Sequence, residues 1–430
     1  MINKLIRVLN SYRSSSDDSI SSILRVIHSR PRNIVVYLVP DNDARSGHTE
    51  FFRSLSREES VGIPSVALSC YVLRRLRTRV ILKLLIFVSK PFKINVTIIS
   101  NDGISNLKNV ALGKIKTLIT FWFNSPDESE VFWRGQARRP SKIIEFFVPR
   151  DDSYLPPSES GTIQIETLPV VSSLIPNQKA LTPSTPQIVF AGDIRIDLRP
   201  EVAASLNLKG VSSHKNIEID DYFWDLANMR LDECGKVYPF TIHEFWRTFP
   251  ELETRSEGSD LEVLQDGLRL TLHSRERYLY IVRLCESGFA DRTIVIGNQW
   301  RQFPSVSSRV HHLSRFPESE TPGEVQRARV CPDFGSSLGL IPIYMRAQIL
   351  ATKTGGLLQR SSVNGNPFLA GVEESRTFDS FSNFLDKIDQ MLSISEQEWL
   401  DDASQIRENY NELYDSYRLD FCRKVNEHIE

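Results

Sequence analysis

The sequence has few cysteines and no cluster of metal-binding side chains. Its five cysteines are scattered over 430 residues, without a C-x-x-C pair and without a Cys/His group at zinc spacing. These absences argue against a disulfide framework and a structural zinc site, so we expect a reducing compartment and no bound metal.

Long apolar runs are also missing. The most apolar stretch, residues 80–88, is far shorter than the roughly 20 residues that a membrane-spanning helix needs. The N-terminus, MINKL, leads into a mixed polar segment instead of the apolar core of a signal peptide. We therefore expect a cytoplasmic protein that is not integral to a membrane.

The charges nearly balance, with a formal net charge of −2, so the whole chain gives no argument for nucleic-acid binding. One segment, residues 74–93, is locally basic and interleaves its charges with apolar residues. It could dock on anionic lipid at the inner face of a membrane, or it could be a core-packed helix with a solvated face. Its cations are Arg74, Arg75, Arg77, Arg79, Lys83, Lys90 and Lys93.

Short apolar segments alternate with helical patterns along the chain. Residues 33–40, 94–100, 116–123 and 143–148 have the continuous apolar character of buried strands. The spacing predicts helices over 17–29, 48–56 and 65–88, and again over 274–288 and 345–353. Strands that alternate with helices predict an α/β protein whose parallel sheets are covered on both faces. Amphipathic helices are expected from residue 378 to the C-terminus.

The composition changes in the middle of the chain. Residues 151–186 are rich in Ser, Thr and Pro, which is typical of a linker, and a new apolar strand follows at 187–193. We therefore predict an N-terminal domain over 1–150, a linker over 151–186 and a second α/β domain over 187–405. Residues 406–430 are predicted to form a C-terminal helix that could cross back to the first domain.

Four segments carry a resemblance to the GT-B glycosyltransferases, in particular to the group-1-like and spore-maturation-type families. They are the strand and turn IVFAGD at 188–193, the strand end IVIGNQW at 294–300, the segment 333–358, and FWFNSPD at 121–127. Segment 333–358 combines a small-residue loop, a helix around YMRAQ, and a Gly-Gly pair before a new strand. The resemblance implies two Rossmann-like domains that face a cleft, with a nucleotide-sugar donor site in the C-terminal domain.

The same resemblance implies roles for single residues. The loop from Asp333 to Gly339 would hold the donor diphosphate on backbone N–H groups, and Arg346 would pair with the phosphates. In the acceptor-side domain, His48 or Asp127 would be the catalytic base. The donor-binding candidates together are Gly192, Arg195, Gly297, Asp333, Gly335, Ser336, Ser337, Tyr344, Arg346 and Gln348.

The sequence departs from this family at its acidic pair. Retaining members carry a Glu-x7-Glu pair, where this chain has Ser336 and Tyr344, or Gln348 if the helix is aligned on Arg346. The expected function is metal-independent transfer of a sugar from a nucleotide-diphosphate donor, with no further cofactor, to a glycan, lipid-linked or protein acceptor. Two alternatives stay open, namely an inactive scaffold that binds a glycan or protein, and a sugar-nucleotide epimerase on the same fold.

Overall fold

The structure is a computed structural model that describes the strands, most of the second half of the chain and the C-terminal helices. The described residues are 32–39, 51, 55, 65–69, 85–86, 93–101, 115–122, 141–147, 163–167, 185–192, 194, 196–198, 200–206, 213–232, 240–255, 261–297, 299–303, 306, 310–311, 323–334, 354–361 and 366–429.

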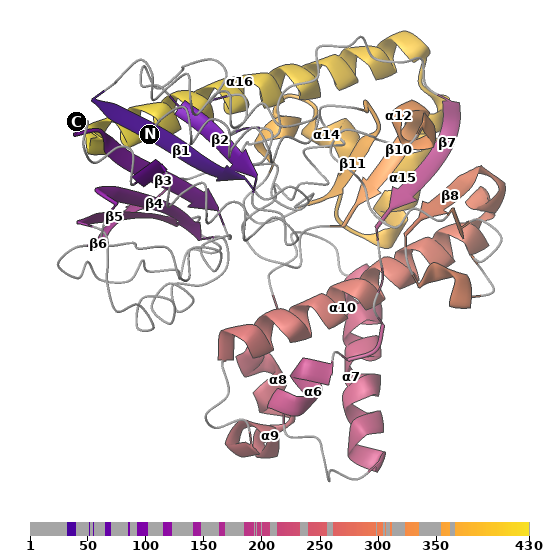
Figure 1. The fold of residues 1–430 in the computed structure, drawn as a ribbon. Helices are drawn as coiled ribbons and strands as arrows, with labels where there is room; N and C mark the ends of the chain where they lie inside the picture. The colour runs from indigo at the N-terminus through magenta and orange to yellow at the C-terminus, as the bar shows by residue number, and fades with distance from the viewer. Residues whose placement is uncertain are drawn as a thin grey trace, which may run out of the picture. The chain divides into compact units, whose positions relative to one another are not determined.

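The chain divides into two compact units, each built on a parallel β-sheet (Figure 1). The first unit comprises Met1–Pro149, Ser153–Ile175 and Asp415–Glu430, and the second comprises Arg150–Asp152 and Pro176–Tyr414. The predicted α/β class with parallel sheets and C-terminal helices is confirmed, and it is compatible with a two-domain Rossmann-like fold. The finer domain and linker boundaries stay a prediction.

The sheet of the first unit has six strands in the order β2-β1-β3-β4-β5-β6, and every pairing is parallel. The central strands are almost fully buried, which agrees with their continuous apolar sequences. The strands are β1 (Asn33–Val39), β2 (Ser65–Ser69), β3 (Asn95–Asn101), β4 (Thr117–Trp122), β5 (Lys142–Phe147) and β6 (Ile163–Thr167).

Strand β2 corrects one sequence prediction. Residues 65–69 (SVALS) were expected to begin a long helix over 65–88, but they pair in parallel with β1. Three apolar residues between two serines fit a helix turn and a short strand equally well, so periodicity alone does not separate them. Leu85 and Ile86, later in the same expected helix, are helical and buried.

The sheet of the second unit also has six parallel strands, in the order β12-β11-β10-β7-β8-β9. Counted from β7, this is the Rossmann order 6-5-4-1-2-3. The strands are β7 (Thr185–Ala191), β8 (Thr293–Ile296), β9 (Val310–His311), β10 (Ala328–Asp333), β11 (Leu357–Arg360) and β12 (Thr377–Phe378).

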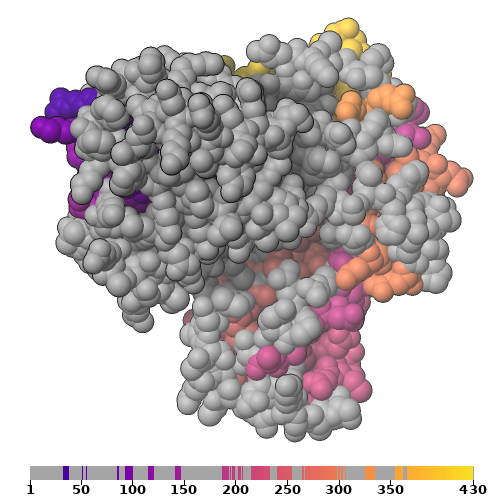
Figure 2. Space-filling view, viewed as in Figure 1, coloured from indigo at the N-terminus to yellow at the C-terminus, as the bar shows by residue number. Residues whose placement is uncertain are grey.

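A group of helices, here called the helical layer, is inserted in the chain between β7 and β8, two strands that pair directly in the sheet. It consists of α6 (Pro200–Ser205), α7 (Ser213–Asp232), α8 (Ile242–Thr248), α9 (Pro250–Arg255) and α10 (Leu261–Leu284). The layer has its own aromatic-rich core, in which Phe223 stacks on Phe245 with ring centroids 5.7 Å apart. Residues of this layer also form part of the surface that Figure 2 shows.

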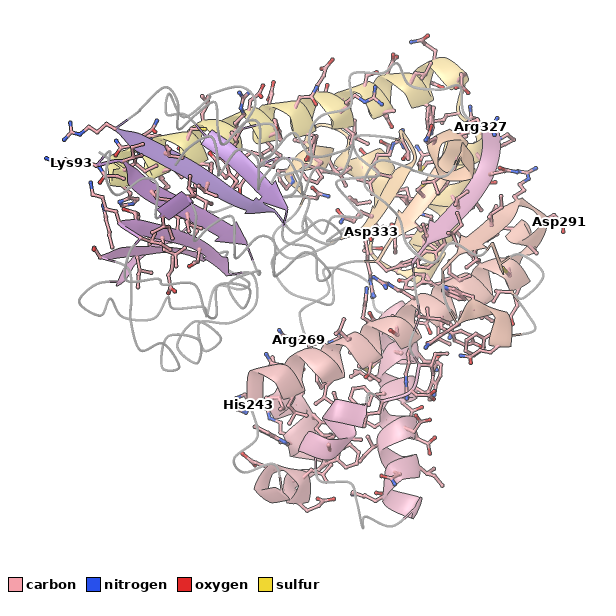
Figure 3. The ribbon with its side chains drawn as sticks, in the orientation of Figure 1. Lys93, His243, Arg269, Asp291, Arg327 and Asp333 are labelled. Carbon is pink, nitrogen blue, oxygen red and sulfur yellow. The ribbon has the colours of Figure 1, made fainter. Side chains whose placement is uncertain are left out.

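Helix α10 packs with the helical layer along its first half and against the sheet along its second half. Its first half, with Leu264 and Leu268, packs in the core of the helical layer, whereas Tyr280 and Leu284 pack on the sheet (Figures 1 and 3). At its midpoint the buried Arg275 donates to the carbonyl oxygens of Ile196 and Asp220. Short 3-10 and π segments follow at η4 (Cys285–Phe289) and η5 (Ala290–Arg292).

The remaining elements complete the second unit. They are η6 (Trp300–Gln302), α12 (Gly323–Arg327), η8 (Pro367–Leu369), α14 (Glu373–Arg376), α15 (Phe381–Ser393) and α16 (Glu396–Ile429). Helix α15 shares the α10 side of the sheet, because Phe384 and Ile388 belong to the same apolar core as Tyr280 and Val330.

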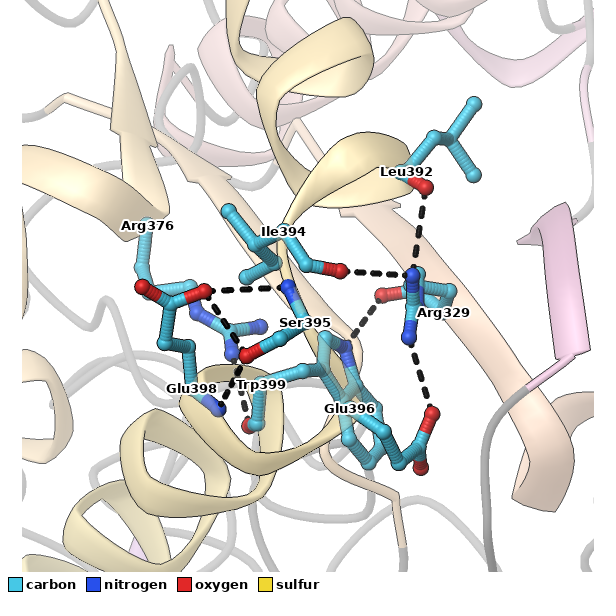
Figure 4. Close-up of polar contacts among 8 residues, drawn as sticks. All are labelled: Arg329, Arg376, Leu392, Ile394, Ser395, Glu396, Glu398 and Trp399. Carbon is cyan, nitrogen blue, oxygen red and sulfur yellow. Dashed lines mark hydrogen bonds and ion pairs between the residues drawn. The ribbon is translucent and has the colours of Figure 1, made fainter.

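Strand β10 fixes the corner between α15 and α16 through Arg329 (Figure 4). Its guanidinium donates to the carbonyl oxygens of Leu392 and Ile394 and pairs with Glu396 at 2.8 Å. Ser395 and Glu398 cap α16 reciprocally: Ser395 Oγ accepts from the Glu398 N–H at 3.2 Å, and the Ser395 N–H donates to Glu398 Oε2 at 3.0 Å.

Helix α16 is continuous over 34 residues, and its last part belongs to the first unit. There Phe421 packs against Phe51 and Phe146 with ring centroids 5.4 and 6.0 Å away. Lys142 Nζ also donates to the carbonyl oxygen of His428 at 3.2 Å. The C-terminal turns are therefore part of the packing of the first sheet.

Candidate functional site

The candidate site is the carboxyl-end edge of the second sheet, where β7 lies beside β10. From β7 the chain continues in one direction to β8 and β9, and from β10 it continues in the other direction to β11 and β12. Open α/β sheets bind ligands outside the carboxyl ends of their strands at such a reversal. Strand β7 ends at Ala191 and β10 ends at Asp333, so these two ends define the position.

The end of β7 is held by its neighbours. The Gly192 N–H donates to the Ile296 carbonyl oxygen at 2.8 Å, and the Gly192 carbonyl oxygen accepts from Trp300 Nε1 at 2.8 Å. Trp300 is fully buried and packs edge-on against Phe190. Because both backbone groups of Gly192 have partners, this glycine could offer a ligand close approach of the backbone but no free N–H.

The chain bends after the end of β8, where two described residues have unusual backbone conformations. Gly297 has φ 150°, and Gln299 has the left-handed φ of 68°, which only glycine adopts without cost. The turn leads straight into η6, which begins at Trp300. The Trp300 indole, at the start of η6, reaches Gly192.

A chain of polar side chains lies at the ends of β10 and β11. Asp333 is only 1% exposed, and its Oδ2 accepts from Gln359 Nε2 at 3.0 Å. The side-chain oxygen of Gln359, Oε1, accepts in turn from Asn366 Nδ2, and Asn366 Oδ1 accepts from the Phe368 N–H at 3.0 Å. Asp333 and Gln359 are register partners in the ladder, so the strand pairing orients the carboxylate. A buried, oriented carboxylate can accept hydrogen bonds from ligand hydroxyl groups.

Three of the predicted site residues lie at this edge. Gly192, Gly297 and Asp333 all follow or end neighbouring strands, and Figure 3 shows Asp333 at the end of β10. The other predicted residues lie outside the described ranges, and so does the basic segment 74–93 apart from Leu85, Ile86 and Lys93. The residues outside are His48, Asp127, Arg195, Gly335, Ser336, Ser337, Tyr344, Arg346 and Gln348.

Sequence reasoning missed Gln359 and Asn366. The signal was present, because Gln359 is a polar residue that continues the apolar run after a Gly-Gly pair, in the sequence GGLLQ at 355–359. A polar side chain inside a buried strand needs a hydrogen-bond partner. The partner could not be named, since Asp333 is 26 residues away and meets Gln359 only through the strand register.

Comparison with known proteins adds no family to this description. No protein-family model and no curated protein sequence matches the chain. Within the described ranges, no helix is long and apolar enough to cross a membrane, and no group of His, Cys, Asp and Glu side chains could hold a metal ion. The functional interpretation therefore depends on this chain's own residues.

Proposed function

We propose that the protein is a glycosyltransferase that binds a nucleotide-diphosphate sugar outside the carboxyl ends of β7 and β10. The observation that carries the proposal is the strand order, which reverses between these two strands. Asp333 supports it, because this carboxylate lies at the reversal and is oriented by Gln359. In the proposed complex Asp333 accepts a hydrogen bond from a ribose or sugar hydroxyl group.

The diphosphate would be held by the chain after β10. The segment 335–339 (GSSLG) consists mostly of small residues, so its backbone N–H groups could approach phosphate oxygens closely. Arg346 would neutralise the charge that develops on the leaving diphosphate. Arg195, after β7, is the second proposed cation. In this mechanism no metal takes part, and these cations stabilise the leaving group.

The first unit would present the acceptor. Its strand order also reverses, between β1 and β3, and the proposed bases follow two of its strands, His48 after β1 and Asp127 after β4. A base at this position would deprotonate an acceptor hydroxyl group on a glycan, lipid or protein. A lipid-linked acceptor would suit a cytoplasmic enzyme that touches the membrane surface through residues 74–93.

A thermal-shift screen of the purified chain against UDP, GDP, CDP, dTDP and their common sugars tests the donor site. A ligand that binds only the folded state raises the melting temperature by mass action. We expect one nucleotide to give a clear shift that Arg346→Ala removes. Arg423→Ala is the control, because Arg423 is 60% exposed at the C-terminal end of α16.

Two further outcomes would change the proposal. If no nucleotide shifts the melting temperature, the donor site is refuted, and the absence of Glu at positions 336, 344 and 348 would favour the scaffold alternative. If a nucleotide sugar binds and is isomerised without an acceptor, as followed by chromatography of the sugar nucleotide, the protein is an epimerase.

A further inference from the structure

A buried group of charged side chains lies where α7, α10 and β11 meet. Glu276 of α10 is fully buried, and its Oε1 is 3.6 Å from Nη1 of both Arg230 and Arg360. Arg230 comes from the end of α7, and Arg360 is the last residue of β11. The side chain of Arg360 is fully buried, and that of Arg230 is 8% exposed.

One hydrogen bond links members of this group, from Arg360 Nη2 to the backbone carbonyl oxygen of Arg230, and most of their other buried polar atoms are not satisfied by one another. A separation of 3.6 Å is too long for a hydrogen bond. Both carboxylate oxygens of Glu276, Nη1 of Arg230, and Nε and Nη1 of Arg360 have no hydrogen-bond partner in the part of the chain that the structure describes. The hydroxyl group of Tyr280 also has no hydrogen-bond partner among the described residues. The ring centroid of Tyr280 is 5.5 Å from the Arg360 guanidinium.

The charges of the group do not balance. Burial alone would raise the pKa of Glu276, but His273, Arg360 and Arg230 together lower it, so the carboxyl group is ionised near neutral pH. Among the described residues, Glu276 is the one acid within ion-pair distance of either arginine. The carboxylate also has His273 Nδ1 3.8 Å from its Oε2. Two guanidinium groups against one carboxylate therefore leave an excess positive charge in a buried place even when His273 is neutral, and an uncompensated buried charge is costly.

We propose that Arg230, Arg360 and Tyr280 form a binding site for a small oxyanion of the phosphate or sulfate class. The planar guanidinium groups suit tetrahedral oxyanions, which they can bind through two parallel hydrogen bonds. The anion enters beside Arg230, the least buried member, and accepts from the free N–H groups and the Tyr280 hydroxyl. Glu276 keeps the two guanidinium groups in place and leaves the group with a net positive charge.

This anion site is separate from the proposed donor site. Successive side chains of a strand point to opposite faces of the sheet, so Arg360 lies on the other face from Gln359, which holds Asp333. Its face is the one that carries Tyr280 of α10. The proposal therefore does not depend on the nature of the donor.

Inorganic phosphate and sulfate are the probes, compared with chloride at matched ionic strength. Thermal unfolding and calorimetric titration of the full chain should show stabilisation and saturable binding with both oxyanions but not with chloride. Arg360→Lys keeps the positive charge but loses the fork geometry, so we expect it to weaken phosphate binding roughly ten-fold or more. Glu276→Gln removes a neighbouring negative charge and should tighten phosphate binding roughly ten-fold.

Arg376→Lys is the matched control. Arg376 is also fully buried, but its guanidinium already donates to Asp402 and to the carbonyl oxygens of Gly355 and Trp399. The control should lose stability without any change in its response to phosphate. The proposal is overturned if the wild-type chain responds to phosphate as it does to chloride, or if Glu276→Gln and wild type bind phosphate equally. A nucleotide response that survives in Arg360→Lys separates this site from the donor site.

Discussion

The hydrogen bond between Trp300 and Gly192 gives a test of the carboxyl-end edge of the second sheet. Trp300→Phe removes the indole N–H, leaves the Gly192 carbonyl oxygen without its donor and replaces a fully buried indole by a smaller ring. The lost bond with its unsatisfied acceptor costs about 1–3 kcal/mol, and the smaller ring adds about 1 kcal/mol. We expect the free energy of unfolding to fall by about 2–4 kcal/mol.

Trp399→Phe is a closely matched control. Trp399 is also fully buried, and its indole Nε1 donates to a backbone carbonyl oxygen of the same sheet, that of Arg329, at 2.9 Å. Arg329 is the second residue of β10, so this bond lies near the amino end of the strand, away from the proposed ligand. The two variants should therefore lose similar stability but differ in their effect on ligand binding.

Urea unfolding measures the loss of stability, and calorimetric titration measures affinity for the nucleotide that the thermal-shift screen selects. Trp300→Phe should weaken nucleotide binding, because Gly192 and the Gly297 turn lose their common anchor, whereas Trp399→Phe should leave it unchanged. Hydrogen exchange of the peptide that contains Gly192 gives a readout without ligand. Equal loss of affinity in both variants would refute the placement of the ligand, and a Trp300→Phe protein as stable as wild type would refute the energetic argument.

The parallel α/β class could be predicted from the sequence because buried parallel strands have continuous apolar runs. The run at 33–40 corresponds to β1 (Asn33–Val39), and the run at 187–193 overlaps β7 (Thr185–Ala191). The prediction was wrong for a short segment, which has no such run. Five residues at 65–69 are too few for a period to show, and only the pairing with β1 makes them a strand.

Of the helical layer between β7 and β8, the sequence predicted only the second half of α10, through the helix expected over 274–288, and the other helices of the layer received no assignment. Helix α7 mixes apolar residues with many acids, so no clear apolar stripe stands out. Its buried residues, among them Phe223 and Ala227, become recognisable only when α8 and α10 pack against them. Contacts with α8 and α10, more than the periodicity of its own sequence, determine which face of α7 is buried.

The candidate site was only partly predictable. Gly192 and Asp333 were expected at the edge because they lie in segments that resemble the donor domain of GT-B glycosyltransferases, and both follow or end an apolar run that could be recognised as a strand. Partners that are far apart in the chain cannot be located in this way: Arg230 and Arg360 are 130 residues apart, and only the packing of α7 beside β11 brings them together. Single-sequence patterns contain no signal for such pairs.

Two further substitutions test the packing and the electrostatics of the second unit. Gly355→Ala would place a Cβ 2.4 Å from the Cβ of Ala403 on α16, so we expect the free energy of unfolding in urea to fall by about 2–3 kcal/mol. Gly371→Ala has open space around the new Cβ and a φ of 82°, so it should lower the free energy of unfolding by only about 1 kcal/mol. Equal losses in the two variants would contradict the packing argument. Ser395→Ala tests the cap of α16, where hydrogen bonds from the Ser395 side chain and backbone lower the pKa of Glu398. A carboxylate whose pKa is lower in the folded state stabilises the fold above its unfolded-state pKa, and this contribution is lost as the pH falls through the folded-state pKa. Unfolding measured over a pH series should therefore show the largest deficit of Ser395→Ala at neutral pH, with the gap to wild type narrowing in acid, and a gap that stays constant with pH would show that the Glu398 charge plays no part in the cap.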